Sequence, residues 1–492
     1  MPTIGKAKLQ IWVKRLGLLL AFPVLSVIFA IGYVSIKIAT YEQRDDAVHM
    51  AAKAAYLESI TRAAPENAPD LVVILFDDLG YGDVGFTGNQ MIATPHMDSL
   101  AAKGVVFENY YAPAPVCSPS RAAMLTGRMA PRAGLTHVPF PSGSTFDRLN
   151  RLFNNPVRLP REEILLSDIL QAVGYETAMV GKWHMGDHAG SVPTQFGFQR
   201  FFGTYYSNDM NPFTLVRGTA DIGEAVSHAA PFDQTQLNRL YAESAERFIT
   251  EAATDKPLFL YFAHNFPHVP LYAAPSEKGR SDAGLYGDVV QGLDDTVGRL
   301  VAALKQRGRF DNTLILITSD NGPWWEGRGV GRGRKGVSFE GGIRVPFIAH
   351  WPQQIEPGRS AALAMGTDLL PTMLDELNVP PPPDRFLDGK SIAASLRGGP
   401  SPHEVLYHYA AGTLMAVRSA THKYRDRKAV AYPTDPVRLP IWQAHGPWLF
   451  DMRADPQETY DISMKQADIA ARLKAQLDAK NAEMRVNPRG WK

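Results

Sequence analysis

Short apolar runs recur along the chain, and polar residues follow several of them directly. Residues 71–76 form a continuous apolar run of strand length, and residues 257–262 and 313–318 repeat this pattern. Such runs are typical of buried parallel strands. Between them, residues 165–172 and 286–307 carry their apolar positions at helical spacing. The alternation of the two patterns predicts an α/β fold.

The N-terminal part of the chain has a different pattern. Residues 16–36 carry no charge, and a helix of that length spans roughly 31 Å, the thickness of a bilayer core. Basic residues lie in 1–15 and acidic residues follow the run, so the positive-inside rule predicts that residues 1–15 are cytoplasmic. We expect a transmembrane signal anchor that leaves the rest of the chain on the exported side, periplasmic or extracellular. A cleaved signal peptide is the alternative, but no Ala-x-Ala site closes the run.

The rest of the chain is too long for one hydrophobic core. Residues 37–69 are rich in alanine and charge, and we expect a linker there that is helical or flexible. A large domain is expected over residues 70–397, with a proline run at 380–383 as a connection near its end. Residues 398–492 have the pattern of short strands and a final helix near 465–483, which predicts a smaller α+β subdomain.

Charge and cysteine content exclude several classes of protein. The formal net charge of +1 gives no basic field of the kind that nucleic-acid-binding proteins use, so we expect no nucleic-acid partner. The chain contains a single cysteine. An internal disulfide and a zinc site built on several thiolates are therefore impossible.

Polar side chains follow two of the predicted strands. Asp77 and Asp78 come directly after the run 71–76, and Asp320 and Asn321 follow the strand 313–318. Ligands of open α/β sheets lie at the carboxyl ends of the strands. Adjacent carboxylates there would repel each other unless a cation joined them. Oxygen ligands predict a hard divalent ion, Ca²⁺ or Mg²⁺.

The single cysteine, Cys117, lies in a segment that is suited to anion binding. Thr94 and Pro95 predict a helix start, and residues 105–107 predict a short strand that leads toward it. The segment 117–128 reads Cys-Ser-Pro-Ser-Arg-Ala-Ala-Met-Leu-Thr-Gly-Arg. Its proline fits the first turn of a helix, which puts Cys117 at a helix N-terminus, and Arg121 lies one turn further on. The alternative is an inert buried thiol.

This segment resembles the signature of the cysteine-type sulfatases, Cys-x-Pro-Ser-Arg followed by Thr-Gly-Arg, at every specified position. Residues 174–186, Gly-Tyr-Glu-Thr-Ala-Met-Val-Gly-Lys-Trp-His-Met-Gly, resemble the family's second signature. The resemblance covers roughly residues 70–460 and is of the arylsulfatase type within the alkaline phosphatase superfamily. It implies a large mixed, mostly parallel sheet sandwiched by helices, followed by the smaller C-terminal α+β subdomain.

The resemblance also implies a set of site residues. In the family the cysteine is oxidised to formylglycine (3-oxoalanine), whose hydrated aldehyde is the nucleophile, and a separate maturation enzyme makes this group. It implies a metal site of Asp77, Asp78, modified Cys117, Asp320 and Asn321. The residues implied as catalytic are Cys117, Arg121, Lys182, His184, His268 and Lys335.

Some of these assignments have alternatives in the sequence. Ser207 corresponds to a family serine that contacts the sulfate, but it also fits an ordinary turn serine. His268 corresponds to the catalytic histidine of a Pro-His-x-Pro motif, and His264 is the alternative to it. Lys182 and His184, two positions apart, would share one side of the chain if the backbone stays extended. His445, on a predicted loop, has two alternatives: it reaches the rim of the pocket, or it has a structural role, which a single loop histidine fits better.

The resemblance implies a sulfatase that hydrolyses the sulfate ester of a small molecule or a glycan. A phosphonate monoester or phosphodiester hydrolase could use the same site, since related enzymes with the modified cysteine act on phosphorus. A third reading is a metal-dependent binding module without catalysis. The many charged residues that the motifs would bring into one cleft count against it, because burying charges without a function is unfavourable.

Overall fold

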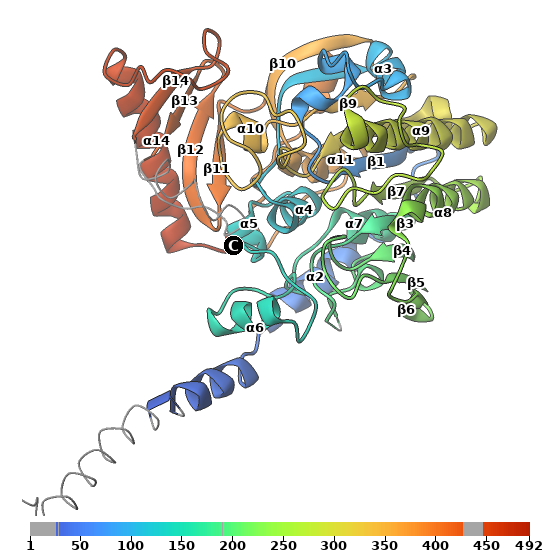
Figure 1. Cartoon of the computed structure of the whole chain (residues 1–492), viewed down its shortest axis with the longest axis horizontal. Helices are drawn as coiled ribbons and strands as arrows, with labels where there is room; N and C mark the ends of the chain where they lie inside the picture. The colour runs from blue at the N-terminus through green and yellow to red at the C-terminus, as the bar shows by residue number, and fades with distance from the viewer. Residues whose placement is uncertain (1–25, 28, 189, 427–445) are drawn as a thin grey trace, which may run out of the picture.

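The computed structural model describes residues 26–27, 29–188, 190–426 and 446–492 (Figure 1). In this part of the chain, two sheets form separate layers, and helices cover both faces of the larger one. The strands are β1 Asp70–Phe76, β2 Val105–Tyr111, β3 Glu176–Lys182, β4 Arg200–Thr204, β5 Leu215–Thr219, β6 Gly223–His228, β7 Leu258–Ala263, β8 Thr313–Ser319, β9 Phe347–His350, β10 Gly358–Met365, β11 Val405–Ala410, β12 Thr413–Ser419, β13 His422–Arg425 and β14 Trp448–Asp451.

The helices include those that were expected from the sequence near residues 95, 117, 165 and 286. After residue 45, the described α-helices are α2 Ala47–Ile60, α3 Pro95–Ala102, α4 Cys117–Thr126, α5 Ala130–Ala133, α6 Thr145–Leu152, α7 Leu166–Ala172, α8 Leu237–Glu251, α9 Gly284–Gln306, α10 Glu340–Ile343, α11 Leu369–Glu376, α12 Ala393–Leu396 and α14 Ala467–Val486. These bounds agree with the predicted helices to within a few residues.

The large sheet has the strand order β10-β2-β9-β8-β1-β7-β3-β4-β5-β6. Its central strands β8, β1, β7 and β3 are all parallel, whereas β9, β5 and the edge strand β6 pair antiparallel to their neighbours. The prediction of a mixed, mostly parallel sheet is confirmed. Because the central strands are parallel and in register, their carboxyl ends meet at one edge of the sheet.

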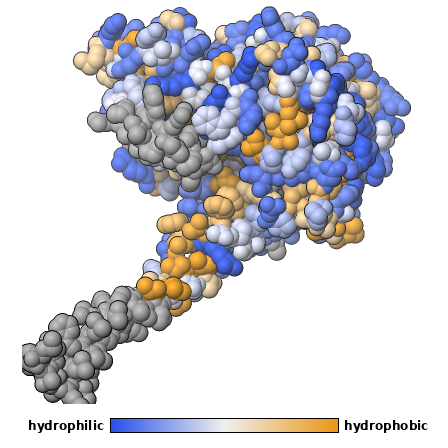
Figure 2. All heavy atoms as spheres, viewed as in Figure 1, coloured by the Kyte–Doolittle hydropathy of each residue, from blue (hydrophilic) through white to orange (hydrophobic). Residues whose placement is uncertain are grey.

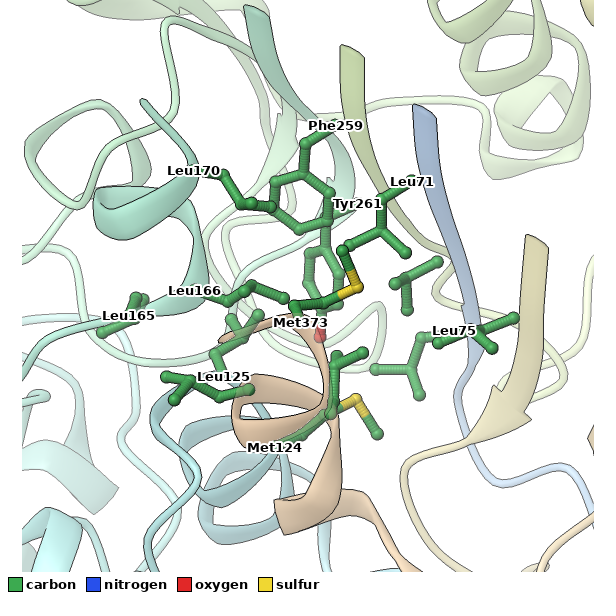
Figure 3. Packing of buried hydrophobic residues seen from close by; sticks show 14 of the residues in the cluster. Leu71, Leu75, Met124, Leu125, Leu165, Leu166, Leu170, Phe259, Tyr261 and Met373 are labelled. Carbon is green, nitrogen blue, oxygen red and sulfur yellow. The ribbon is translucent and has the colours of Figure 1, made fainter. Parts of the chain in front are cut away.

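Side chains of the central strand β1 alternate between two hydrophobic layers. Leu71, Val73 and Leu75 point into one layer, and the intervening residues point into the other. Figure 3 shows the first layer, in which strand residues pack against the helices α4, α7 and α11. The second layer packs the sheet against α3, α8 and α9. Both faces of this strand are therefore buried, as its continuous apolar run predicts.

The C-terminal residues form the smaller second layer. Strands β11, β12, β13 and β14 make an antiparallel sheet, and helix α14 packs against it through Leu473 and Leu477. This confirms the predicted α+β character of the C-terminal part. His445 lies outside the described residues.

The segment that was expected to be a linker is packed on the large domain over much of its length. Tyr56 and Ile60 of α2 are buried in the main core, and Asp45 forms ion pairs with Arg158 and Arg161. Of the two forms that were expected for this linker, helical or flexible, the structure has the helical one in α2, and this helix is packed against the domain. The physical reason is that the alanine-rich helix carries two large apolar side chains on one face, which the composition of the segment does not reveal.

Among the described residues, no helix is both long and apolar enough to span a membrane. Most of the predicted transmembrane segment 16–36 lies outside the described residues, which begin at residue 26. The described end of this segment is helical, and its apolar side chains, including Phe29 and Ile36, are exposed.

Candidate active site

The polar residues that were predicted from the sequence to form a site lie at the carboxyl ends of the central strands. Asp77 and Asp78 follow β1, Lys182 ends β3, and Asp320 and Asn321 follow β8. All of these side chains are buried. The parallel register of the sheet therefore assembles a polar cluster from distant parts of the sequence.

Cys117 is the first residue of α4 and points into this cluster. Its side chain is 2% exposed, and Sγ lies 3.2 Å from Asp77 Oδ1 and 3.2 Å from Lys335 Nζ. Burial, followed by the nearby Asp77 carboxylate, raises the pKa of the Cys117 thiol well above its ordinary value. As a thiol, residue 117 is thus protonated and a poor nucleophile.

Three buried cations pair with the three carboxylates. Lys182 donates to Asp77, and Lys335 Nζ lies 2.7 Å from Asp78 Oδ1. Arg121 Nε lies 2.8 Å from Asp320 Oδ2. Burial alone would raise the pKa of Asp77, but the surrounding cations, first Lys182, hold it well below its usual value. The cluster is close to electrically neutral, so an added divalent cation would leave it attractive to an anion.

The carboxylates fit a divalent metal ion. Asn321 Oδ1 is buried and has no hydrogen-bond partner among the described residues, while its Nδ2 donates to Asp78 Oδ1 at 2.6 Å. Burial and the charge of Asp77 raise the pKa of Asp320 to about 7, so the protein alone does not fully stabilise its charge. A free amide oxygen beside carboxylates is the donor set that Ca²⁺ and Mg²⁺ prefer.

A second group of potential ligands consists of Asp77, Asp78, Cys117 and His268, whose ligand atoms lie within 4.8 Å of one another. The two aspartates belong to both sets of ligands. Sulfur and nitrogen suit softer metals than the oxygen set does. The oxygen set is the better match to a hard cation, which leaves His268 available for the substrate.

The two candidate histidines after β7 have different surroundings. His268 Nε2 lies 3.7 Å from Asp78 Oδ2, and its Nδ1 lies 3.5 Å from Ser207 Oγ. Ser207 in turn accepts from Lys182 Nζ at 3.3 Å. His264 instead accepts the backbone N–H of Phe266 at Nδ1 and lies among aromatic rings. The geometry favours His268 over His264 and puts Ser207 inside the cluster.

His184 differs from the sequence expectation in its backbone. The expected extended chain ends before this residue, whose φ is +58°. The backbone N–H of His184 still donates to the carbonyl of Tyr205 at 2.8 Å, so the chain leaves the extended conformation at this residue while it remains paired with the segment after β4. Neither ring nitrogen has a hydrogen-bond partner among the described residues. Burial, and then Lys182, lower the pKa of His184 well below its ordinary value, so the ring is neutral.

One supporting residue has no counterpart among the predicted site residues. Asn208 Nδ2 donates to the carbonyls of His268 and Pro270, at 3.2 Å and 2.9 Å. It therefore fixes the loop that carries His268. The only indication of this role in the sequence is that Asn208 directly follows Ser207, and an asparagine at this position is equally typical of a turn.

Comparison with known proteins identifies the family. The family model described as "Sulfatase" matches residues 69–379, and the model "N-sulphoglucosamine sulphohydrolase, C-terminal" matches residues 333–483. The chain is 34% identical to human (Homo sapiens) arylsulfatase A over 468 residues, which covers 84% of this chain and 88% of that protein. It is 33% identical to mouse (Mus musculus) N-acetylgalactosamine-6-sulfatase over 383 residues, which covers 74% and 73%.

A solved structure agrees with these relationships. The PsFucS1 sulfatase from Pseudoalteromonas sp. superimposes with a TM-score of 0.76 at 27% identity, covering 90% of this chain and 96% of that one. The matched regions include both the large sheet, which carries the polar cluster, and the C-terminal subdomain. The chain therefore belongs to the sulfatase family and is a sulfuric ester hydrolase.

Proposed function

We propose that this protein is an arylsulfatase-type enzyme whose nucleophile is a formylglycine formed from Cys117 by a separate maturation enzyme. A divalent ion, Ca²⁺ or Mg²⁺, is held by Asp77, Asp78, Asp320 and Asn321, with residue 117 as a further ligand. The substrate is a sulfated small molecule or glycan, the compound classes that the names of the relatives indicate. The enzyme is attached to a membrane by its N-terminal helix and acts on the exported side.

The observation that carries this proposal is the position of Cys117. It begins α4, and its sulfur contacts both a carboxylate and an ammonium at the edge of the sheet. The free N–H groups of a helix N-terminus favour an anion at this point. A nucleophile made from this side chain would therefore face the sulfate group of a bound ester.

Three cationic side chains near position 117 would bind the sulfate group. Arg121 Nη2 is buried without a hydrogen-bond partner among the described residues, so one donor remains for a sulfate oxygen. Lys182 and Lys335 each bring a buried ammonium to the same cluster. Charge-assisted hydrogen bonds of this kind are strong, and their preorganisation stabilises charge that develops in the transition state.

The proposed reaction also needs two groups that are not among the twenty encoded side chains, formylglycine and a divalent metal ion. Formylglycine supplies the nucleophilic oxygen, and the divalent ion supplies Lewis acidity toward a sulfate oxygen. Asp77, Asp78 and Asp320 provide the negative charge that holds such an ion, and Asn321 adds its free amide oxygen. Arg121 and Lys182 hold the carboxylates in position through their own ion pairs.

Two histidines handle protons. His268 lies at the edge of the cluster beside Ser207, and we assign its doubly protonated ring as the acid that gives the Nε2 proton to the leaving alcohol. Burial lowers the pKa of His268, so the protonated ring gives up this proton readily. Lys335 is the alternative acid. His184 is neutral, and its ring nitrogens have no protein partner among the described residues, so it can accept a proton near residue 117. The acid acts before the alcohol leaves, and the base acts afterwards.

The test is mass spectrometry of the peptide that contains residue 117, taken from active enzyme, together with assays on sulfate and phosphonate esters. We expect an aldehyde at residue 117 and a preference for sulfate. Serine at position 117 should be nearly inactive because an ordinary alcohol cannot form the hydrated aldehyde. An unmodified cysteine throughout an active sample would refute the proposal. A clear preference for phosphonate monoesters would instead indicate the alternative hydrolase.

A further inference from the structure

Helix α6 presents its polar side to the protein and its apolar side outward. Asp147 is 1% exposed and Asn150 is also buried. Phe146 is 58% exposed, Leu149 is exposed, and Phe153, which directly follows the helix, is 68% exposed. Positions 146, 149 and 153 share one face of a helix. This is the reverse of the usual amphipathic helix of a soluble domain, which buries its apolar face.

The inward polar side chains have specific partners that fix this orientation. Asp147 accepts from the backbone N–H of Gly143 at 2.9 Å and from Arg151 Nε at 2.9 Å. Asn150 Nδ2 donates to the carbonyl of Val138 at 2.9 Å. The Asp147–Arg151 pair lies within the helix and would turn with it, but turning the helix over would break the Asn150–Val138 bond and expose the buried Asp147 and Asn150 side chains to new surroundings. The outward apolar face is therefore a stable feature of the fold.

This apolar face lies beside the point where the N-terminal helix joins the domain. Tyr41 donates its hydroxyl to the carbonyl of Asn155 at 2.7 Å, and Val157 donates its N–H to Gln43 at 2.9 Å. Figure 1 shows α6 at the end of the molecule from which the N-terminal helix leaves. The described part of that helix exposes Phe29 and Ile36. In Figure 2 hydrophobic residues gather at this junction.

We propose that α6 is a second membrane contact, which lies in the bilayer surface next to the N-terminal anchor with Phe146, Leu149 and Phe153 among the acyl chains. The occupant is a lipid bilayer because α6 lies at the end of the domain from which the N-terminal helix leaves, and that helix exposes Phe29 and Ile36 of the uncharged run 16–36. Interfacial helices bury their apolar face about 5–10 Å into the headgroup and acyl boundary. Arg148, exposed next to this face, can contact anionic headgroups.

The second contact would fix the orientation of the active site toward the membrane. A single helical anchor leaves a domain free to rotate about its connection, whereas two contacts do not. α6 is bonded to the segment that follows His184. Ser142, just before the helix, donates to Asp187 at 2.5 Å, and Arg151 Nη2 lies 3.0 Å from His188 Nε2. The inference rests on the membrane attachment proposed above, and its experiment separates the two.

The experiment labels position 149 of the full-length protein with an environment-sensitive fluorophore. Leu149→Cys is made in a Cys117→Ser background so that the label is unique, and the protein is reconstituted into phosphatidylcholine and phosphatidylglycerol vesicles with or without a doxyl-quencher lipid. We expect roughly twofold or greater quenching, since the label would lie at the depth of the quencher. The matched control is Ile222→Cys, 85% exposed at the turn between β5 and β6, away from the N-terminal helix, which should not be quenched.

Flotation of the same vesicles measures whether the protein is attached to the membrane through its N-terminal anchor, independently of the quenching at position 149. Protein that floats while position 149 stays unquenched would overturn the α6 contact and leave the anchor intact, whereas protein that does not float would overturn both. Shielding of position 149 that depends on protein concentration in detergent would point to a second copy of the chain and refute the lipid contact. A Phe146→Ser and Phe153→Ser double variant should still float but lose most of the quenching, because these positions are exposed and their replacement leaves the fold intact.

Discussion

Lys335 Nζ lies 3.2 Å from Cys117 Sγ, although 218 residues separate the two in the sequence. The same ammonium is 2.7 Å from Asp78 Oδ1. One side chain thus contacts both the proposed nucleophile position and a proposed metal ligand. Burial would lower the pKa of Lys335, but the carboxylates, first Asp78, raise it well above its ordinary value, so the side chain remains charged.

We predict that Lys335→Met lowers kcat on a sulfate ester by about 10²–10³-fold, because a preorganised charge is lost where the transition state is most negative. The control is Lys423→Met. Lys423, in β13 of the C-terminal sheet, is also buried and pairs with Glu340 of α10 and with Glu458. Both variants should lose stability, but only Lys335→Met should lose activity per folded molecule. Equal activity losses per folded molecule would contradict the assignment.

We predict that removal of divalent metal lowers both activity and melting temperature. The buried carboxylates Asp77, Asp78 and Asp320 would repel one another more strongly without the ion. Calcium or magnesium at a hundred times its Kd should restore about 2.7 kcal/mol of stability. Thermal unfolding with chelator and with added metal measures this shift. Asp320→Asn should reduce the metal-dependent shift in melting temperature. The control is Asp294→Asn, which replaces a buried aspartate away from the site and should leave the shift unchanged. Full activity of protein shown to be free of metal would refute the site.

We predict that the two histidine variants respond differently to the leaving group. His268→Ala should lose about 10²–10⁴-fold on an alkyl sulfate and much less on a nitrophenyl sulfate, because a nitrophenolate leaves without protonation. His184→Ala should slow both substrates alike, with fast initial release of alcohol before a slow phase. Steady-state and rapid-mixing kinetics of both variants measure this. Equal losses for His268→Ala on the two esters would make His264 or Lys335 the candidate acid.

We predict that the stability of the fold depends on pH through Asp294, a buried residue outside the active site. It accepts the backbone N–H groups of His96 and Met97, and burial raises its pKa from 3.8 to about 6. The folded state therefore binds more protons than the unfolded state between these values, and stability falls as the pH rises through this window. The fall amounts to roughly 3 kcal/mol.

The measurement for Asp294 compares melting temperatures of the wild type and Asp294→Asn from pH 4 to pH 7. An asparagine cannot titrate, so the difference between the two proteins should change across this range and level off above it. A constant difference at every pH would contradict the raised pKa. Groups such as Asp45, whose pKa is lowered to about 2, contribute equally to both proteins and cancel.

The sequence by itself determined the elements that present the site. The apolar runs before Asp77 and Asp320 predicted buried parallel strands, because a strand buried on both faces needs apolar residues at every position. The proline two residues after Cys117 predicted a helix that begins near Cys117, because the fixed backbone angle of proline suits the first turn of a helix. These patterns depend only on residues that are close in sequence, so the strands and the helix start can be predicted without knowledge of the fold.

Only the tertiary structure decided how these elements meet. The choice between His268 and His264 depends on how the loop after β7 turns, and Asn208, from another segment, holds that loop. The close pairing of Lys335 with Asp78 likewise depends on contacts between distant segments. The packing of α2 and the outward apolar face of α6 depend on which partners each helix face meets. Such contacts join residues far apart in sequence, and no local pattern of hydrophobic and polar positions encodes them.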